Sequence, residues 1–174
     1  MKPTQFSDMP CPIARSMGRV GDSWSMLILR DAFQGMTRFD EFVKSTGIAP
    51  NILTRRLNDL VDNGMLERRL YNEKPPRHEY LLTEMGRSFR PIMFALITWG
   101  NKHFSPDGIR MQLVNRETGA PAVPMLFDAE TQQPLTEERY MVAPGPAASD
   151  TMRERLANAE LRRRERLGIT PPGP

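Results

Sequence analysis

Polar side chains that can form hydrogen bonds recur at helical spacing in the segment that follows Gly47. They belong to Asn51, Thr54, Arg55 and Asn58. In a helix this spacing places Asn51, Arg55 and Asn58 on one side together with Asp62, and Thr54 beside them, because successive residues turn by about 100°. In the major groove, arginine can donate two hydrogen bonds to guanine, and asparagine can pair with adenine. The predicted chemistry is binding to base edges, with Arg55 and Asn51 as base readers and Thr54 and Asn58 contacting bases or backbone.

The opposite side of the same segment is apolar and predicts the helix that carries these side chains. Its apolar positions are Ile48, Leu53, Leu57, Leu60 and Val61. Pro50 suits the first helical position, since the N–H that proline lacks has no partner there. Gly64 suits the helix end. A solvated amphipathic helix would show the same pattern, so the flanking segments must decide between the two interpretations.

Three shorter helices are predicted before this one. The first covers residues 12–20, and the second follows Asp22 or Ser23, either of which can cap it. The second helix would bury Trp24, Leu27, Ile28, Ala32 and Phe33. The third opens at Thr37 or Arg38 and turns Phe39, Phe42 and Val43 toward the core. A tight turn at Ser45-Thr46-Gly47 then leads into the polar helix, which is the order of a helix-turn-helix.

After Gly64 the pattern predicts a β-hairpin and a long helix. Residues 65–71 and 78–82 favour strands, and residues 72–77 form a basic tip whose prolines should not continue the ladder. Lys74 and Arg77 in this wing, with Arg56 on the side of the polar helix, suit phosphates or the minor groove. Thr83 is the expected cap of a long helix to Phe104, and Pro91 should bend it or mark a late start.

Short motifs spread over residues 10–104 occur together in one order. They are Cys11-Pro12-Ile13, Gly21-Asp22-Ser23-Trp24, Phe39-Asp40-Glu41-Phe42, Gly47-Ile48-Ala49-Pro50, Leu53-Thr54-Arg55-Arg56-Leu57, Asp62-Asn63-Gly64, Pro75-Pro76-Arg77-His78-Glu79-Tyr80 and Leu82-Thr83-Glu84-Met85-Gly86. In this combination the chain resembles the HxlR-type branch of bacterial winged helix-turn-helix regulators. The resemblance implies a mainly α (α+β) fold and a homodimer formed by the first helix and the long helix 84–104. It also implies a transcriptional role, usually repression.

Cys11 is the candidate sensor of oxidants or electrophiles. It precedes the first helix, whose N-terminal turn could lower a thiol pKa, and Arg15 lies one turn further on. Some HxlR-type proteins respond through a cysteine near this position. The other interpretation is an inert, small apolar residue at an interface. A single cysteine excludes an internal disulfide and a cysteine-based zinc site.

The remaining chain divides by composition into an appendage, residues 105–143, and a linker, helix and tail, residues 144–174. The appendage predicts two small hairpins like a zinc ribbon without its cysteines, with no metal and no cofactor. Its expected apolar cluster is Leu113, Val123, Leu126, Phe127 and Leu135. A charged helix should begin with a capping box at Thr151 and Glu154 and run to about Leu167. It could be solvated, docked on a partner or an accessory DNA contact; residues 168–174 should be disordered.

Composition limits the function further. The net charge of +3 permits nucleic-acid binding without requiring it. Residues 1–9 form an N-terminal tail without the apolar core of a signal peptide, and no apolar run is long enough for a membrane span, so we expect a cytoplasmic protein. His78 and His103 have no catalytic partners at motif spacing, so we expect no enzyme. The predicted function is a dimeric DNA-binding regulator with an unidentified small-molecule or oxidant effector. The alternative is a winged-helix protein-interaction module.

Overall fold

The computed structural model describes residues 6–168 and consists of two compact units. One unit is Met1–Val123 and the other is Pro124–Pro174. The boundary between them falls inside the appendage that the composition predicted as residues 105–143. No helix in the part of the chain that the structure describes is long and apolar enough to cross a membrane.

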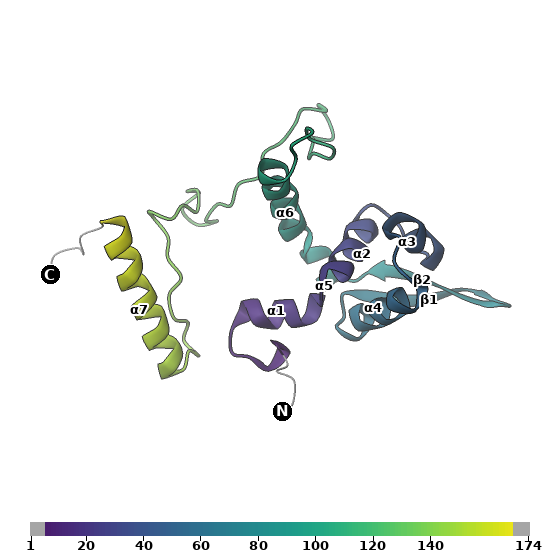
Figure 1. Ribbon diagram of the computed structural model, residues 1–174, viewed down its shortest axis with the longest axis horizontal. Coiled ribbons are helices and arrows are strands. Elements are labelled where there is room, and N and C mark those ends of the chain that lie inside the picture. The colour runs from purple at the N-terminus through teal and green to yellow at the C-terminus, as the bar shows by residue number, and fades with distance from the viewer. Residues whose placement is uncertain (1–5, 169–174) are drawn as a thin grey trace. The chain divides into compact units, whose positions relative to one another are not determined.

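The first unit contains short helices, a two-stranded hairpin and a broken long helix (Figure 1). In chain order its elements are η1 Phe6–Asp8, α1 Pro12–Val20, α2 Ser23–Phe33, α3 Phe39–Thr46, α4 Pro50–Asp62, β1 Leu66–Glu73, β2 Pro76–Leu82, α5 Glu84–Ser88 and α6 Arg90–His103. This is the element order of a winged helix-turn-helix, which confirms the predicted fold class.

Local residue chemistry accounts for the helix ends. The Asp22 carboxylate caps α2 by accepting hydrogen bonds from the backbone N–H of Trp24 and Ser25, at 3.0 and 3.1 Å. Gly47 ends α3 with a left-handed backbone, φ 69° and ψ 11°. Glycine adopts this conformation without steric cost. Pro50 begins α4 at the expected position. The turn between α3 and α4 is therefore set by Gly47 and Pro50.

The hairpin is longer than the sequence predicted. β1 and β2 are antiparallel, and their register pairs Leu66 with Leu82 and Glu73 with Pro76, with an irregularity between Leu70 and Asn72. The expectation that residues 72–77 could not continue the ladder was wrong at Asn72, Glu73, Pro76 and Arg77. Pro76 is tolerated because it is the first residue of its strand. The turn itself is only Lys74-Pro75.

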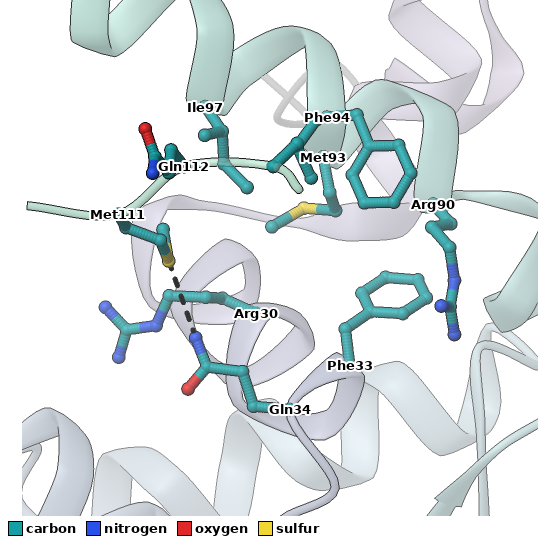
Figure 2. Close-up of a pocket in the computed structure, with 10 residues that line it drawn as sticks. Arg30, Phe33, Gln34, Arg90, Met93, Phe94, Ile97, Met111 and Gln112 are labelled. Carbon is teal, nitrogen blue, oxygen red and sulfur yellow. Dashed lines mark hydrogen bonds between the residues drawn. The ribbon is translucent and has the colours of Figure 1, made fainter. Parts of the chain in front are cut away.

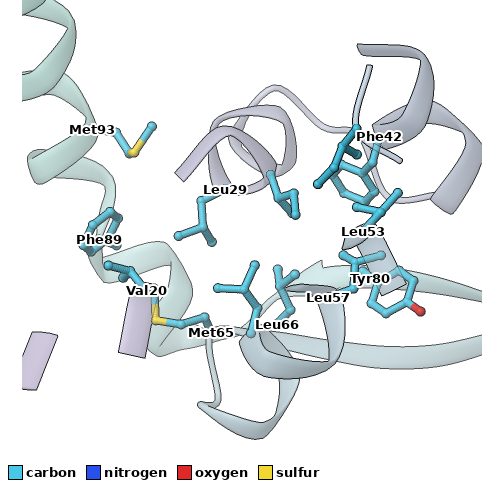
Figure 3. Close-up of a cluster of buried hydrophobic side chains, with 13 residues drawn as sticks. Val20, Leu29, Phe42, Leu53, Leu57, Met65, Leu66, Tyr80, Phe89 and Met93 are labelled. Atoms are coloured by element: carbon cyan, nitrogen blue, oxygen red, sulfur yellow. The ribbon is translucent and has the colours of Figure 1, made fainter. Parts of the chain in front are cut away.

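The core lies between the helices and the base of the hairpin (Figure 3). It consists of Val20, Ile28, Leu29, Phe42, Ile48, Leu53, Leu57, Leu60, Met65, Leu66, Tyr80, Phe89 and Met93. The predicted burial of Trp24 was wrong, since its side chain is 38% exposed and Leu29 is fully buried. The buried residues of α2 are Ser25, Ile28, Leu29 and Asp31, because this side of α2 faces α3, α4 and β2.

The long C-terminal helix of the winged-helix unit is interrupted. α5 ends at Ser88, and α6 starts at Arg90 with Pro91 in its first turn, as the proline predicted. Thr83 caps α5 by accepting a hydrogen bond from the Gly86 N–H at 2.9 Å. Its hydroxyl also donates to the Gly64 carbonyl at 2.6 Å. Thr83 thus links the residues that follow α4 to the start of α5.

Two tight turns follow α6, one in each unit. Asn115 accepts hydrogen bonds from the N–H of Glu117 and Thr118, and Asp128 accepts from Glu130 N–H and the Thr131 hydroxyl. Each turn closes a single β-bridge, Val114 to Pro121 and Phe127 to Pro134. None of the residues of the predicted apolar cluster is buried: Val123, Leu126, Phe127 and Leu135 are 79%, 66%, 52% and 45% exposed, and Leu113 is half-buried. Local side-chain hydrogen bonds hold these turns instead.

The second unit contains α7, Asp150–Leu167. Its cap is Ser149, whose hydroxyl accepts from the Met152 N–H at 3.3 Å. The predicted cap at Thr151 was therefore two residues late. Gly168 ends α7 in the left-handed conformation. The predicted disorder at residues 169–174 lies outside the described residues.

Candidate nucleic-acid interface

The rotation of α4 about its axis is fixed by three leucines. Leu53 and Leu57 are completely buried and Leu60 is 1% exposed. The opposite side is solvent-exposed and carries the predicted base-reading side chains Asn51, Thr54, Arg55 and Asn58. The structure therefore brings these four residues together on one exposed helix face.

Most of these polar groups are available for a ligand. Within residues 6–168, the side chains of Asn51, Arg55 and Asn58 make no hydrogen bond or ion pair. The Thr54 hydroxyl donates to the Pro50 carbonyl at 2.9 Å, which leaves its oxygen able to accept. The face thus presents arginine and amide donors next to amide and hydroxyl acceptors, which is the chemistry that base edges require.

Arg56 lies on a different side of α4 and has partners within the protein. Its guanidinium pairs with the Asp22 carboxylate and, at 3.1 Å, with Asp59. The side chain is only 21% exposed. Asp22 is also the cap of α2, so Arg56 connects the recognition helix to the start of its neighbouring helix. A phosphate contact by Arg56 would have to compete with these two carboxylates.

The two predicted wing cations lie at the tip of the hairpin. Lys74 is in the turn, and Arg77 is the second residue of β2; both side chains are exposed. The hairpin extends beyond the ends of α3 and α4 (Figure 1). Neither cation has a carboxylate partner in the described part of the chain. The wing therefore offers positive charge at a second place, separate from the α4 face.

Sequence analysis missed the exposed side chain of Arg38, which the structure brings to the wing. A β-bridge joins Arg38 to Glu79, and its guanidinium lies over the Tyr71 ring at 4.8 Å. Both contacts join residues more than thirty positions apart, so no local pattern could reveal them. Thr37, a residue favoured in strands, gave a weak signal.

The start of α3 is held by the Glu41 carboxylate. Hydrogen bonds from the backbone N–H of Arg38 and then of Thr37 lower the pKa of Glu41 below its ordinary value. Both donor–acceptor distances are 2.8 Å. Since Arg38 immediately precedes α3 and pairs with Glu79 of β2, this cap also fixes the place where the wing meets the helix-turn-helix.

Cys11 lies apart from the α4 face. It is half-buried and occupies the position just before α1, with an extended backbone of φ −77° and ψ 122°. The Arg15 Nε donates to the Met9 carbonyl at 2.7 Å. This orientation turns the Arg15 guanidinium toward the chain that precedes Cys11.

In this chain α3 and α4 form a helix-turn-helix, the β1–β2 hairpin forms a wing, and α4 exposes a polar face. These features define a winged helix-turn-helix protein. Residues 19–108 match the HxlR-like helix-turn-helix family, and the chain belongs to that family.

Its relatives include transcriptional regulators. The chain is 35% identical over 135 residues to the HTH-type transcriptional regulator Rv3095 of Mycobacterium tuberculosis, itself uncharacterised, covering 77% of this chain and 85% of that protein. The crystal structure of PA1607, described as a candidate transcription factor, is similar with a TM-score of 0.73 and 40% identity, over 82% of this chain and 100% of the other. The redox regulator HypR in its reduced form is similar, with a TM-score of 0.50 and 31% identity. The match covers 53% of this chain and 92% of the HypR chain.

Proposed function

We propose that this protein is a sequence-specific DNA-binding transcriptional regulator that acts as a homodimer, in the role of a repressor. The observation that carries the proposal is the exposed α4 face, on which Asn51, Arg55 and Asn58 have no partner in the described protein. Polar side chains that the fold leaves unpaired on an anchored helix suit a ligand with matching donors and acceptors. Family membership supports DNA as that ligand.

The proposed contacts divide into base readers and backbone contacts. Arg55 reads guanine and Asn51 reads adenine, with Thr54 and Asn58 contacting bases or the sugar-phosphate backbone. Lys74 and Arg77 contact phosphates or the minor groove beside the site. Because the structure pairs Arg56 with Asp22, we assign it primarily to holding α4 in position.

Salt-dependent gel retardation tests this proposal. Purified protein should retard DNA from upstream of its own gene more strongly than an unrelated fragment, and affinity should fall as salt rises, because released counterions drive phosphate contacts. Replacement of Lys74 and Arg77 by glutamine should flatten the salt dependence. If no DNA is bound even at low salt, the alternative, a protein-interaction module, replaces this proposal.

The homodimer is supported by apolar side chains that the first unit leaves exposed. On α1, Ile13 is 71% and Met17 is 46% exposed. On α6, Ile92, Leu96 and Trp99 are 48%, 41% and 56% exposed. Contiguous exposed apolar side chains on adjacent helical turns are typical of an association surface. Two recognition helices would then meet two half-sites about one helical turn apart.

Light scattering tests the dimer. The full chain should have twice the mass of one chain at micromolar concentration, and Leu96→Asp should give monomers, since a charge at the interface would lose its hydration. Lys102→Glu near the exposed end of α6 is the control and should remain dimeric. A monomeric unmodified protein would contradict the proposal.

We also propose that Cys11 senses oxidants. The similarity of this chain to the redox regulator HypR supports this proposal. A half-buried cysteine immediately before α1 can transmit oxidation to the proposed interface helix. The test is DNA binding before and after hypochlorite treatment. Unmodified protein should respond and Cys11→Ser should not; an equal response in both proteins would rule the cysteine out.

A further inference from the structure

A cavity in the first unit lies away from the α4 face and from Cys11. It is lined by the end of α2, the first turns of α6 and the segment after α6, is partly open to solvent, and has a volume of about 160 Å³. Its walls are mainly apolar and include Phe33, Met93, Phe94, Ile97, Met111 and Leu113. Figure 2 shows Phe33 pointing from α2 toward Met93 and Phe94 of α6. An engineered apolar cavity of about 150 Å³ holds one benzene molecule, so this space fits a single aromatic ring.

The charged groups around the cavity are all positive. Arg30 and Arg90 contribute to its lining, and no aspartate or glutamate does. Arg30 is neutralised by Asp31 at 2.7 Å. Arg90 has no carboxylate partner within residues 6–168, and its guanidinium lies over the Phe33 ring at 5.2 Å. Arg90 is therefore an unneutralised cation at one end of an apolar, ring-sized space.

We propose that this cavity binds a monocyclic aromatic carboxylate, with the ring between Phe33, Met93 and Phe94 and the carboxylate paired with Arg90. The planar guanidinium can donate two parallel hydrogen bonds to a carboxylate. Gln34, whose amide donates to the Met111 sulfur at 3.8 Å, also lines the cavity.

The position of the cavity suggests how such a ligand acts, and this step rests on the proposed function. α2 packs on the recognition helix α4, and α6 carries the exposed apolar residues of the proposed dimer. A ring inserted between α2 and α6 shifts one helix relative to the other. In the dimer this displacement changes the separation of the two recognition helices and with it the affinity for DNA.

Calorimetric titration of the full chain with sodium benzoate tests the binding site without DNA. Benzoate should bind once per chain with millimolar or tighter affinity. Arg90→Gln should weaken this binding about tenfold or more, because a charge-assisted hydrogen bond is lost. Lys102→Gln removes the same charge from α6 outside the cavity and should bind benzoate as the unmodified protein does. Absence of benzoate binding, or equal weakening by both variants, overturns the proposal.

Two further titrations separate the contribution of the aromatic ring to binding from that of the carboxylate. Benzyl alcohol, which has the ring without the carboxylate, should bind weakly and equally to the unmodified protein and to Arg90→Gln. Ile97→Phe, which fills the cavity, should abolish binding of both compounds while its circular dichroism stays unchanged. Benzoate binding that survives in a folded Ile97→Phe protein would place the ligand elsewhere and overturn the assignment.

The regulatory step has a separate readout. Benzoate should change the DNA affinity of the unmodified protein and leave that of Arg90→Gln unchanged. If benzoate binds by calorimetry but the protein binds no DNA, the proposed function fails and the ligand site stands. If the protein binds both benzoate and DNA but benzoate leaves the DNA affinity unchanged, the proposed coupling through α2 and α6 is wrong.

Discussion

α4 and α7 both carry arginines, but only in α4 is the polar face held in position by residues buried in the core. Leu53, Leu57 and Leu60 of α4 are buried, whereas none of the described side chains of α7 is buried. The arginines also differ in their partners. Arg55 has none in the described chain, whereas Arg163 and Arg164 both pair with Glu160.

If α4 is the DNA-binding helix, as proposed, this difference means that the number of arginines on a helix does not by itself make it a nucleic-acid surface. A helix face needs an apolar anchor on its other side, so that its donors stay in one position. Its cations also need to be free of nearby carboxylates, since a paired arginine must exchange one anion for another. Arg55 meets both conditions, and the α7 arginines that pair with Glu137 and Glu160 do not.

The largest expected effect concerns the anchor. Leu57→Ala should lower the free energy of unfolding by about 2–5 kcal/mol, because it leaves a cavity in a fully buried site. Leu156→Ala on α7 should have a much smaller effect, since Leu156 is only half-buried. Urea denaturation of both full-length variants measures the difference. Equal destabilisation would show that α7 is anchored as firmly as α4.

The next effect concerns the polar face. Arg55→Ala should weaken binding to the specific DNA site by about 1–3 kcal/mol and should leave stability unchanged. Arg162→Ala, an exposed arginine of α7, should change specific binding little. Fluorescence anisotropy with the same DNA fragment compares the two. A larger loss from Arg162→Ala would move the DNA contact to the C-terminal helix.

The helices of the winged-helix unit could be predicted from the sequence because their signals are local. Asp22, Gly47, Pro50 and Thr83 act on backbone groups within a few residues of themselves, so their positions define helix ends directly. The exposed face of α4 followed from apolar periodicity alone. The predicted interruption at Pro91 depended on the same kind of local constraint.

The parts that could not be predicted depend on contacts between distant residues. The pairing of Arg56 with Asp22 requires the packing of α4 on α2, and the bridge from Arg38 to Glu79 requires the folded hairpin. Trp24 was misplaced because apolar periodicity does not show which side of α2 meets α4. The exposed Val123 and Phe127 were misjudged because hydrogen bonds within each turn replaced an apolar cluster.

The third prediction concerns the contact between α2 and α4. Asp22→Ala removes the cap of α2 and the partner of Arg56, and should cost about 0.5–2 kcal/mol of stability from the cap alone. Asp22→Asn keeps a capping acceptor but removes the charge, so it should cost less. Thermal unfolding measures both. Equal losses would assign the whole effect to the ion pair with Arg56.

The smallest expected effect depends on pH. The pKa of Glu41 is lowered in the fold, so its capping contribution is fully present above its ordinary pKa of 4.5 and is lost as pH falls through the lower folded value. The difference in Tm between unmodified protein and Glu41→Ala should be constant near neutral pH and shrink in acid. A difference that grows in acid would contradict the role of the ionised carboxylate.

Selection of DNA from random oligonucleotides tests the α4 face most directly. The unmodified protein should enrich an inverted repeat with half-sites about one helical turn apart. Arg55→Ala should lose its preference at one base position in each half-site and keep the rest. An identical enriched sequence for both proteins, or no enrichment with the unmodified protein, would contradict the assignment of α4 as the helix that reads DNA.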